Sequence, residues 1–168
     1  MDINASDVQK LRQMTGAGLM DCKKALIEAG GDMDKAVKIL REKGIAKSSK
    51  RADRVAGEGL VNFWISADQT EGIIFELNCE TDFVARNDEF IALGNKILDQ
   101  IKANPSWTNI SQVPTEPVAE LGAKIGEKIE ARRFERIKVQ SGIVSAYIHA
   151  GSKLGVLLGL ESNKAGAP

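Results

Sequence analysis

An internal repeat constrains the fold of this chain more than any other feature of its sequence. Residues 59–77 align without a gap on residues 142–160, and Gly, Val, Ile, Ala, Gly and Leu recur in register. Each copy has an alternating apolar segment, a polar turn and a second apolar segment, which is the pattern of a β-hairpin. The repeat predicts the α+β class, with two related subdomains built on antiparallel sheets.

The first copy continues into further elements, and the second does not. Helix-period patterns follow at residues 88–102 and 118–129, and a charged strand is predicted at 131–139. Alternation slips between Phe134 and Ile137, which predicts an edge strand or a β-bulge.

Eight residues follow Leu160, and a hairpin by itself is marginal in water. We therefore expect the second subdomain to be incomplete. Either the chain has been shortened or another chain covers the open face, so a homo-oligomer is possible.

The N-terminal residues 1–44 have the pattern of three short helices. Ser6–Gln9 has the form of a capping box, and Gly16 is placed to end the first helix in the left-handed conformation. Asp32 is placed to cap the third helix and Gly44 to end it. Such a module has a small core and is only marginally stable alone.

A basic segment joins this module to the repeat. Interspersed Ala, Ser and Asp53 favour a solvated helical linker over a nucleic-acid surface, although the segment contains Lys47, Lys50, Arg51 and Arg54. The predicted organisation is a three-helix module at 1–44, a basic helical linker at 45–58, a first α+β core subdomain at 59–140 and a partial second one at 141–168.

Charge and composition limit the classes of partner. The formal net charge is +0, so no global field steers the chain towards nucleic acid or an anionic membrane. The N-terminus lacks the features of a signal peptide, and no apolar run approaches the ~20 residues of a membrane helix. Cys22 and Cys79 lie in segments whose apolar pattern predicts burial, which suits reduced thiols in the core. We expect a cytoplasmic protein.

The stretch from Asn78 to Asn87 is a strand-to-helix turn, with Asn87 as the helix N-cap. Phe83 is a large apolar residue within this surface connection. It either folds back into the core, as turn aromatics often do, or it is presented beside Asp82 for the pocket of another protein.

The sequence offers little for catalysis. His149 is the only histidine, and a lone imidazole is usually a structural group. Gly16 and Gly18 lack the spacing of a phosphate loop. An acidic cluster is a weak candidate for a metal site; it comprises Glu80, Asp82, Asp88 and Glu89. Its last two residues are already explained as favourable charges at a helix N-terminus. We expect no catalytic residue, no metal and no cofactor.

Four motifs together resemble the elongation factor Ts family. They appear in family order over nearly the whole chain: Thr15-Gly-Ala-Gly-Leu-Met-Asp-Cys-Lys-Lys-Ala-Leu26, Asn78-Cys-Glu-Thr-Asp-Phe-Val-Ala-Arg86, Ala123-Lys-Ile-Gly-Glu-Lys-Ile129 with Arg132-Arg133, and Tyr147-Ile-His149 before Gly155-Val. The resemblance implies an N-terminal module of ubiquitin-associated type and guanine-nucleotide exchange on elongation factor Tu. Longer members of the family continue through the second subdomain.

The resemblance also implies site residues. In the family, the turn matching Thr81, Asp82, Phe83 and Val84 enters the GTPase domain, and the disturbance dislodges Mg²⁺. Docking residues are implied in the helical module and at the second hairpin, which faces the third domain of the partner: Arg12, Leu19, Met20, Lys23 and His149.

Two other classes of function remain open from the residues alone. The helical module with its basic linker could bind RNA or a ubiquitin-like fold. The acidic turn could belong to a small metal hydrolase.

Overall fold

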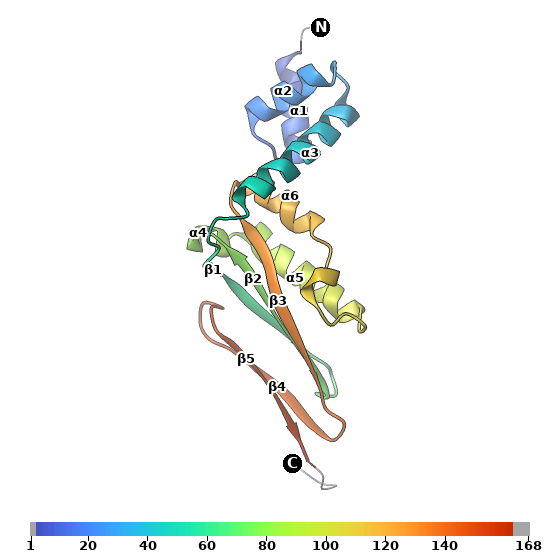
Figure 1. Cartoon of the computed structure of the whole chain (residues 1–168), viewed down its shortest axis with the longest axis vertical. Helices are drawn as coiled ribbons and strands as arrows, with labels where there is room; N and C mark the ends of the chain where they lie inside the picture. Colours follow the sequence, from blue (N-terminus) through green and yellow to red (C-terminus); the bar gives the residue numbers. More distant parts are fainter. Residues whose placement is uncertain (1–2, 163–168) are drawn as a thin grey trace. The chain divides into compact units, whose positions relative to one another are not determined.

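The computed structural model describes residues 3–162, except for the side chains of residues 45–50. The chain forms two compact units, Met1–Arg54 with Glu116–Lys128 and Val55–Thr115 with Ile129–Pro168. Helices and antiparallel sheets both occur (Figure 1), which confirms the predicted α+β class.

The first unit is helical, and its small core is built from residues that recur on one side of each helix. Six side chains are buried there: Val8, Leu11, Cys22, Ala25, Leu26 and Ala36. The helices are α1 (Ala5–Thr15), α2 (Leu19–Glu28), α3 (Met33–Arg51) and α6 (Glu116–Ile125).

Two of the four helix ends predicted within residues 1–44 are confirmed, those at Gly16 and Asp32. Gly16 ends α1 at φ 67°, and Asp32 Oδ1 accepts a hydrogen bond from Lys35 N at 3.0 Å. That backbone hydrogen bond lowers the pKa of Asp32 below its ordinary value. The predicted capping box at Ser6 is wrong, because the N-cap of α1 is Asn4, two residues earlier, whose Oδ1 accepts from Asp7 N at 2.7 Å.

Gly44 does not end the third helix, which continues to Arg51. A Cβ at Gly44 would lie 3.2 Å from Ala123 Cβ of α6. Glycine costs about 1 kcal/mol in a helix interior relative to alanine, and here it allows two helices to approach closely.

Helix α6 belongs to this unit, whereas the sequence-based boundaries place it within residues 59–140. The reason is a set of contacts between distant segments. Arg41 pairs with Glu120 at 3.6 Å, and Lys128 Nζ donates to Ala52 O at 2.8 Å. The side chains of the predicted linker residues Lys47 and Lys50 lie outside the described part of the structure.

The second unit contains the repeat as two hairpins. Its main sheet has the order β1-β2-β3, and the second hairpin forms a two-stranded sheet. Helix α5 lies on one face of the main sheet and the second hairpin on the other (Figure 1). The elements are β1 (Glu58–Ile65), β2 (Glu71–Cys79), α4 (Asp82–Ala85), α5 (Asp88–Ala103), the 3₁₀ turn η1 (Ile110–Gln112), β3 (Ile129–Lys138), β4 (Gly142–Ile148) and β5 (Gly155–Glu161).

Strand β3 confirms the predicted edge position, but its register shift lies between Ala131 and Arg133 and not between Phe134 and Ile137. It pairs only with β2 in the described sheet, and the register shifts between Glu76 and Leu77. Phe134 lies opposite Phe75 and Ile137 opposite Gly72, so these two side chains of β3 point to opposite faces. Because both faces of this sheet are covered, apolar and polar residues do not simply alternate along β3.

The two hairpins pack on each other with approximate twofold symmetry. Val61 N donates to Ser152 O at 2.7 Å, and Val144 N donates to Gln69 O, also at 2.7 Å. The alignment of the two copies matches Val61 with Val144 and Gln69 with Ser152, so the two hydrogen bonds are equivalent. We expected the second hairpin to stand by itself. That expectation is wrong for its inner face, which packs on the main sheet.

Two glycines make this close packing possible. A Cβ at Gly72 would lie 2.7 Å from Val144 Cγ1 and 2.8 Å from Leu157 Cδ1. A Cβ at the equivalent Gly155 would lie 2.6 Å from Val61 Cγ1. Each hairpin thus provides a space for the side chains of the other.

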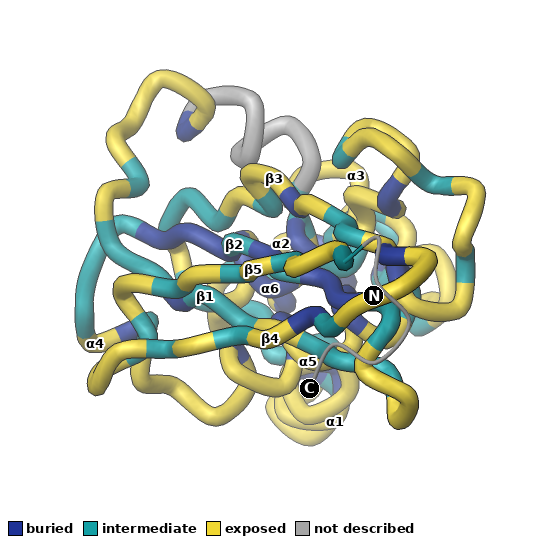
Figure 2. The backbone as a smooth tube through the Cα atoms, turned by 90° about the horizontal axis from the view of Figure 1, so that it is seen from below, coloured by how far each residue is buried: buried dark blue, intermediate teal, exposed yellow. Residues whose placement is uncertain are grey.

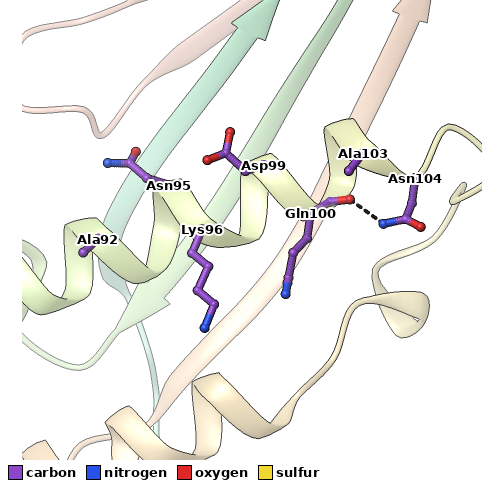
Figure 3. A pocket seen from close by; sticks show the side chains of 7 residues that line it. All are labelled: Ala92, Asn95, Lys96, Asp99, Gln100, Ala103 and Asn104. Carbon is purple, nitrogen blue, oxygen red and sulfur yellow. Dashed lines mark hydrogen bonds between the residues drawn. The ribbon is translucent and has the colours of Figure 1, made fainter.

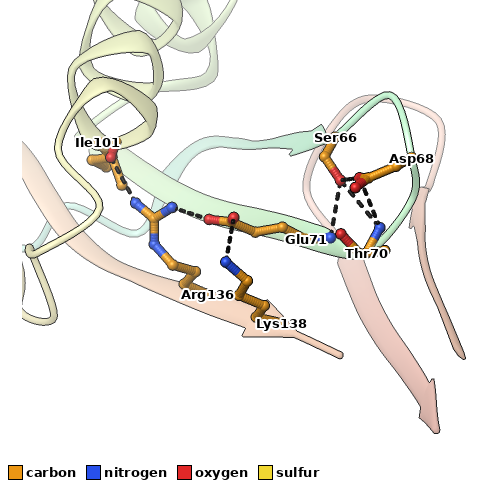
Figure 4. A network of polar contacts seen from close by, with 7 residues as sticks. All are labelled: Ser66, Asp68, Thr70, Glu71, Ile101, Arg136 and Lys138. Atoms are coloured by element: carbon orange, nitrogen blue, oxygen red, sulfur yellow. Dashed lines mark hydrogen bonds and ion pairs between the residues drawn. The ribbon is translucent and has the colours of Figure 1, made fainter. Parts of the chain in front are cut away.

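A polar network ties α5 to the end of the main sheet (Figure 4). Arg136 pairs with Glu71, and its Nη2 donates to the carbonyl of Ile101 at 2.7 Å. The cation thus meets the C-terminal end of α5, where backbone carbonyls lack helical partners. Nearby, Asp68 accepts from Ser66 Oγ and Thr70 N, which lowers the pKa of Asp68.

A second ion-pair group lies on β2 and β3. Burial would raise the pKa of Glu76, but its hydrogen bonds from Arg133 and Arg132 outweigh that effect and lower it. The two contacts measure 2.7 and 2.9 Å.

We predict that Gly72→Val and Gly155→Val each lower the free energy of unfolding by about 1–3 kcal/mol, since the added atoms overpack the contact between the hairpins. Chemical denaturation measures this change. The matched control is Gly57→Val, because Gly57 is exposed and a Cβ there has its nearest neighbour at 3.8 Å. Equal effects at all three positions would contradict the role assigned to the two glycines.

Candidate functional site

The turn after β2 is a short helix with a defined start. Thr81 has extended backbone angles, and its Oγ1 accepts from Val84 N at 3.4 Å. Cys79 is fully buried at the end of β2, and its Sγ donates to Thr81 O at 3.1 Å. Helix α4 is thus anchored at the residue where it begins. Asn87 caps α5 as predicted, with its Oδ1 accepting from Glu89 N at 2.8 Å.

Neighbouring apolar residues of α4 point in different directions. Val84 is 8% exposed, while Phe83 is 81% exposed. Helix α4 contacts β1, β2 and α5, so its buried side is held by three elements. Successive residues of a helix are about 100° apart, and burying Val84 therefore turns Phe83 towards solvent. The interpretation of Phe83 as a core residue is wrong.

Asp82 belongs to the same turn. Its Oδ2 pairs with Arg86 Nη2 at 2.9 Å across one helical turn. Ion pairs of this exposed kind contribute about 0.3–0.5 kcal/mol. The pair therefore orients the carboxylate beside Phe83 more than it stabilises the fold.

The predicted docking residues of the first unit are all exposed. Met20 is 62% exposed, and Leu19 and Lys23 lie on the same helix, α2. Neither Leu19 nor Met20 is buried. Arg12 is exposed near the end of α1, where its carbonyl accepts from Gly16 N at 2.8 Å.

A further exposed apolar residue of α2, Ile27, was not predicted from the sequence. Ile27 is about as exposed as Met20, and positions 20, 23 and 27 fall on one side of a helix. The spacing from Met20 to Ile27 is the signal that could have identified it.

The structure brings His149 to the same end of the second unit as α4. His149 lies in the turn between β4 and β5, and Lys153 of that turn pairs with Glu58 at 2.6 Å. Glu58 in turn lies opposite Cys79, shortly before α4. His149 Nδ1 is 2.9 Å from the hydroxyl oxygen of Tyr147.

An open hollow lies along the polar side of α5 (Figure 3). Its lining offers amide, amino and carboxylate groups, and Asn104 Nδ2 donates to the carbonyl of Gln100 at 2.8 Å. The lining residues are Ala92, Asn95, Lys96, Asp99, Gln100, Ala103 and Asn104. None of them is a serine, cysteine or histidine, so the hollow contains no nucleophile of the Ser-His or Cys-His kind.

Two features are absent from the described residues. Among them, His, Cys, Asp and Glu do not gather in a group of three or more suited to a metal ion. No helix in that part of the chain has the length and apolar character needed to cross a membrane.

The fold and the exposed turn define an α+β protein with a helical N-terminal unit and a pair of repeated hairpins. The family model described as Elongation factor TS matches residues 80–167. The chain belongs to the elongation factor Ts family, as the four sequence motifs predict.

Several relatives named "Elongation factor Ts" match almost the whole chain. One from Clostridium perfringens (strain 13 / Type A) is 47% identical over 165 residues, covering 92% of this chain and 54% of the relative. One from Clostridium kluyveri (strain NBRC 12016) is 46% identical, with 96% and 56% covered. One from Chlorobaculum tepidum is 44% identical, with 96% and 60% covered. The chain spans about half the length of the curated relatives it matches.

We predict that Phe83→Ala leaves the free energy of unfolding of the free protein within about 0.5 kcal/mol of its original value, as for other surface changes. Val84→Ala in the same turn should lower it by about 1–2 kcal/mol, because two buried methyl groups are lost. Thermal or chemical unfolding of the two variants tests the pair. A larger loss for Phe83→Ala than for Val84→Ala would show that Phe83 contributes to the core in solution.

Proposed function

We propose that this chain is a guanine-nucleotide exchange factor of translation elongation. Its partner is elongation factor Tu, in both the GDP-bound and the nucleotide-free states. The observation that carries the proposal is the exposure of Phe83 on a turn that buried Val84 holds in place. Membership in the elongation factor Ts family supports it.

Such a function needs no catalytic group on this chain. GDP in a GTPase is held by backbone N–H groups, a lysine and a bound Mg²⁺. A protein that binds the nucleotide-free conformation better than the loaded one must weaken nucleotide binding, because the coupling is reciprocal. The chain therefore works by binding, without an acid, a base or a cofactor of its own, and we propose that it acts in the cytoplasm.

The proposal assigns Phe83 to a crevice of the GTPase domain, with Thr81, Asp82 and Val84 as the turn that carries it. Insertion of the ring separates elements that support the Mg²⁺ and phosphate site. A helix-capped turn with a buried neighbour suits this task, since little ordering is required on binding.

Docking residues hold the partner from other positions. Leu19, Met20 and Lys23 form an exposed group of mixed apolar and basic character on α2, with Arg12 on α1. His149 lies at the same end of the second unit as α4 and is proposed to face the third domain of the partner. These contacts contribute affinity in every nucleotide state, while Phe83 contributes mainly in the state that releases GDP.

Release of fluorescent GDP from purified elongation factor Tu tests the function. Phe83→Ala should slow stimulated release roughly 5- to 100-fold. Burying such a ring contributes about 1.5–3 kcal/mol, each 1.4 kcal/mol is tenfold, and only the part gained in the state that releases GDP affects the rate. Asp82→Ala keeps the ring and should cost less. Val55→Ala is the control, because Val55 is exposed to a similar extent and lies outside the turn.

The assay also separates the alternatives. Unchanged GDP release on adding the chain would overturn the proposal. Binding to RNA or to a ubiquitin-like protein would then favour a recognition module. Activity without any GTPase that is lost on chelation would favour a metal hydrolase.

The docking role of the helical unit has its own test. Met20→Ala should weaken binding to elongation factor Tu by about 3- to 30-fold, because an exposed apolar side chain loses part of its buried area. Calorimetry measures the affinity. Met14→Ala on α1 is the matched control, since Met14 is exposed to nearly the same extent, and equal affinities for the two variants would exclude a docking role for Met20.

A further inference from the structure

The two hairpins have turns of equal length and closely similar backbone. The repeat aligns residues 66–71 with residues 149–154. Two backbone hydrogen bonds recur at matching positions, with lengths of 2.8 and 3.0 Å in both turns. Gln69 and the matching Ser152 both have φ 56°. The two turns therefore show nearly the same backbone with two different sets of side chains.

Side chains of the first turn occupy two consecutive amide groups of its backbone (Figure 4). Ser66 Oγ accepts from Thr70 N at 3.1 Å and from Glu71 N at 2.9 Å. Asp68 Oδ1 accepts from the hydroxyl of Ser66 at 2.6 Å and from Thr70 N at 3.2 Å. These hydrogen bonds, with that from Ser66 as the largest cause, hold the pKa of Asp68 below its ordinary value. The first turn thus holds a carboxylate of its own.

The second turn has the matching amide groups without these acceptors. Neither Lys153 N nor Leu154 N donates a hydrogen bond to any residue that the structure describes. The positions of the serine and the aspartate are taken by His149 and Gly151. The imidazole Nδ1 of His149 lies 2.9 Å from the hydroxyl oxygen of Tyr147, so it has a partner elsewhere. The two amides are therefore left for an acceptor from outside the turn.

The space beside Gly151 is open. A Cβ at this glycine would have no atom within 4 Å beyond its chain neighbours, and residues 149–151, 153 and 154 are exposed. Figure 2 shows β4 and β5, which this turn connects, as largely exposed or intermediate, in contrast to the largely buried β2. The two backbones differ here, because Gly151 has φ 85° whereas the matching Asp68 does not have a positive φ. An external group can approach where Asp68 lies in the first copy.

Acidic groups that would repel an anion are missing from the second turn. The first turn contains Asp68 and Glu71, whereas residues 149–154 contain no carboxylate. Lys153 pairs with Glu58 at 2.6 Å, which neutralises the charge of that carboxylate. Successive backbone N–H groups in a turn form a concave site for anions, and hydrogen bonds to a charged acceptor are stronger than neutral ones. The second turn is thus suited to a carboxylate.

We propose that the turn at residues 149–154 binds a side-chain carboxylate of the partner protein through the amides of Lys153 and Leu154. The inference rests on the proposed function, because it specifies what the end of the second hairpin recognises on elongation factor Tu. Backbone amides capture carboxylates in this way in other recognition sites. A protein carboxylate is favoured over a nucleic-acid phosphate, because the first copy holds a carboxylate at these amides and a net charge of +0 does not attract nucleic acid.

Amide NMR of the full chain, titrated with sodium acetate, tests the site without any GTPase. Sodium chloride at the same ionic strength is the reference. The amide signals of Lys153 and Leu154 should shift with acetate, while those of Thr70 and Glu71 should not, since their acceptors are already in place. The absence of an acetate-specific shift at Lys153 and Leu154 would mean that these amides bind only water, and it would overturn the proposal. A shift with inorganic phosphate but not with acetate would also overturn it.

A variant of the turn tests the contact with the partner. Gly151→Asp supplies the second turn with the carboxylate that Asp68 supplies to the first, and it should abolish the acetate shift. It should also weaken binding to elongation factor Tu about 3- to 30-fold, because two charge-assisted hydrogen bonds at an exposed site are lost. The matched control is Gly151→Ala, which adds a side chain at the same φ without an acceptor. This control should keep the acetate shift and change the affinity by about twofold at most.

Calorimetry measures both affinities, and circular dichroism verifies that both variants are folded. Equal affinities of the two variants for elongation factor Tu would overturn the proposal, since acetate would then be an adventitious ion only. If the unaltered chain does not bind elongation factor Tu, the proposed function and this partner fail together. A missing acetate shift in a chain that still stimulates GDP release removes only the carboxylate site, so the two failures are distinguishable.

Discussion

The close contact between the two hairpins at Gly72 and Gly155 determines the arrangement of the second unit. At both positions a side chain would overlap atoms of the other hairpin, so the inner faces meet at a distance that only glycine allows. The two symmetry-related backbone hydrogen bonds hold the turns in the same arrangement. As a result, the outer face of the first hairpin meets α5, while that of the second hairpin faces away. The same packing brings the turn with His149 to the end of the unit where β2 leads into α4.

This arrangement explains how a four-residue helix can present a large aromatic ring. A helix as short as α4 is not stable by itself, because nucleation of helical turns is unfavourable. Here β2, β1 and α5 bury Val84, and Thr81 fixes the first turn. The surrounding sheet and helix thus supply the order, and Phe83 remains exposed. The exposed ring and the buried valine are two consequences of one anchored turn.

Local signals in the sequence predicted those parts of the fold that depend on neighbouring residues. Alternation and turn composition identified both hairpins, and helix periodicity identified α5. Predictions failed where contacts between segments far apart in the sequence override the local pattern. Gly44 resembles a helix stop, but α6 packs against it and the helix continues. Helix α6 joins the first unit through contacts such as Arg41 with Glu120, which no local pattern encodes. Among the site residues, the motif located the turn at Phe83, but the motif alone left two orientations of the ring open.

The sequence by itself determined the α+β class, the repeat, the position of the critical turn and the family, because each of these depends on short-range periodicity or on motifs in fixed order. Only the tertiary structure decided that Phe83 points to solvent, that the second hairpin packs on the main sheet, and that its outer face is exposed within the described residues. Burial depends on which surfaces meet in three dimensions. Identical alternation in the two repeat copies therefore leads to a buried face under α5 in one copy and an exposed face in the other.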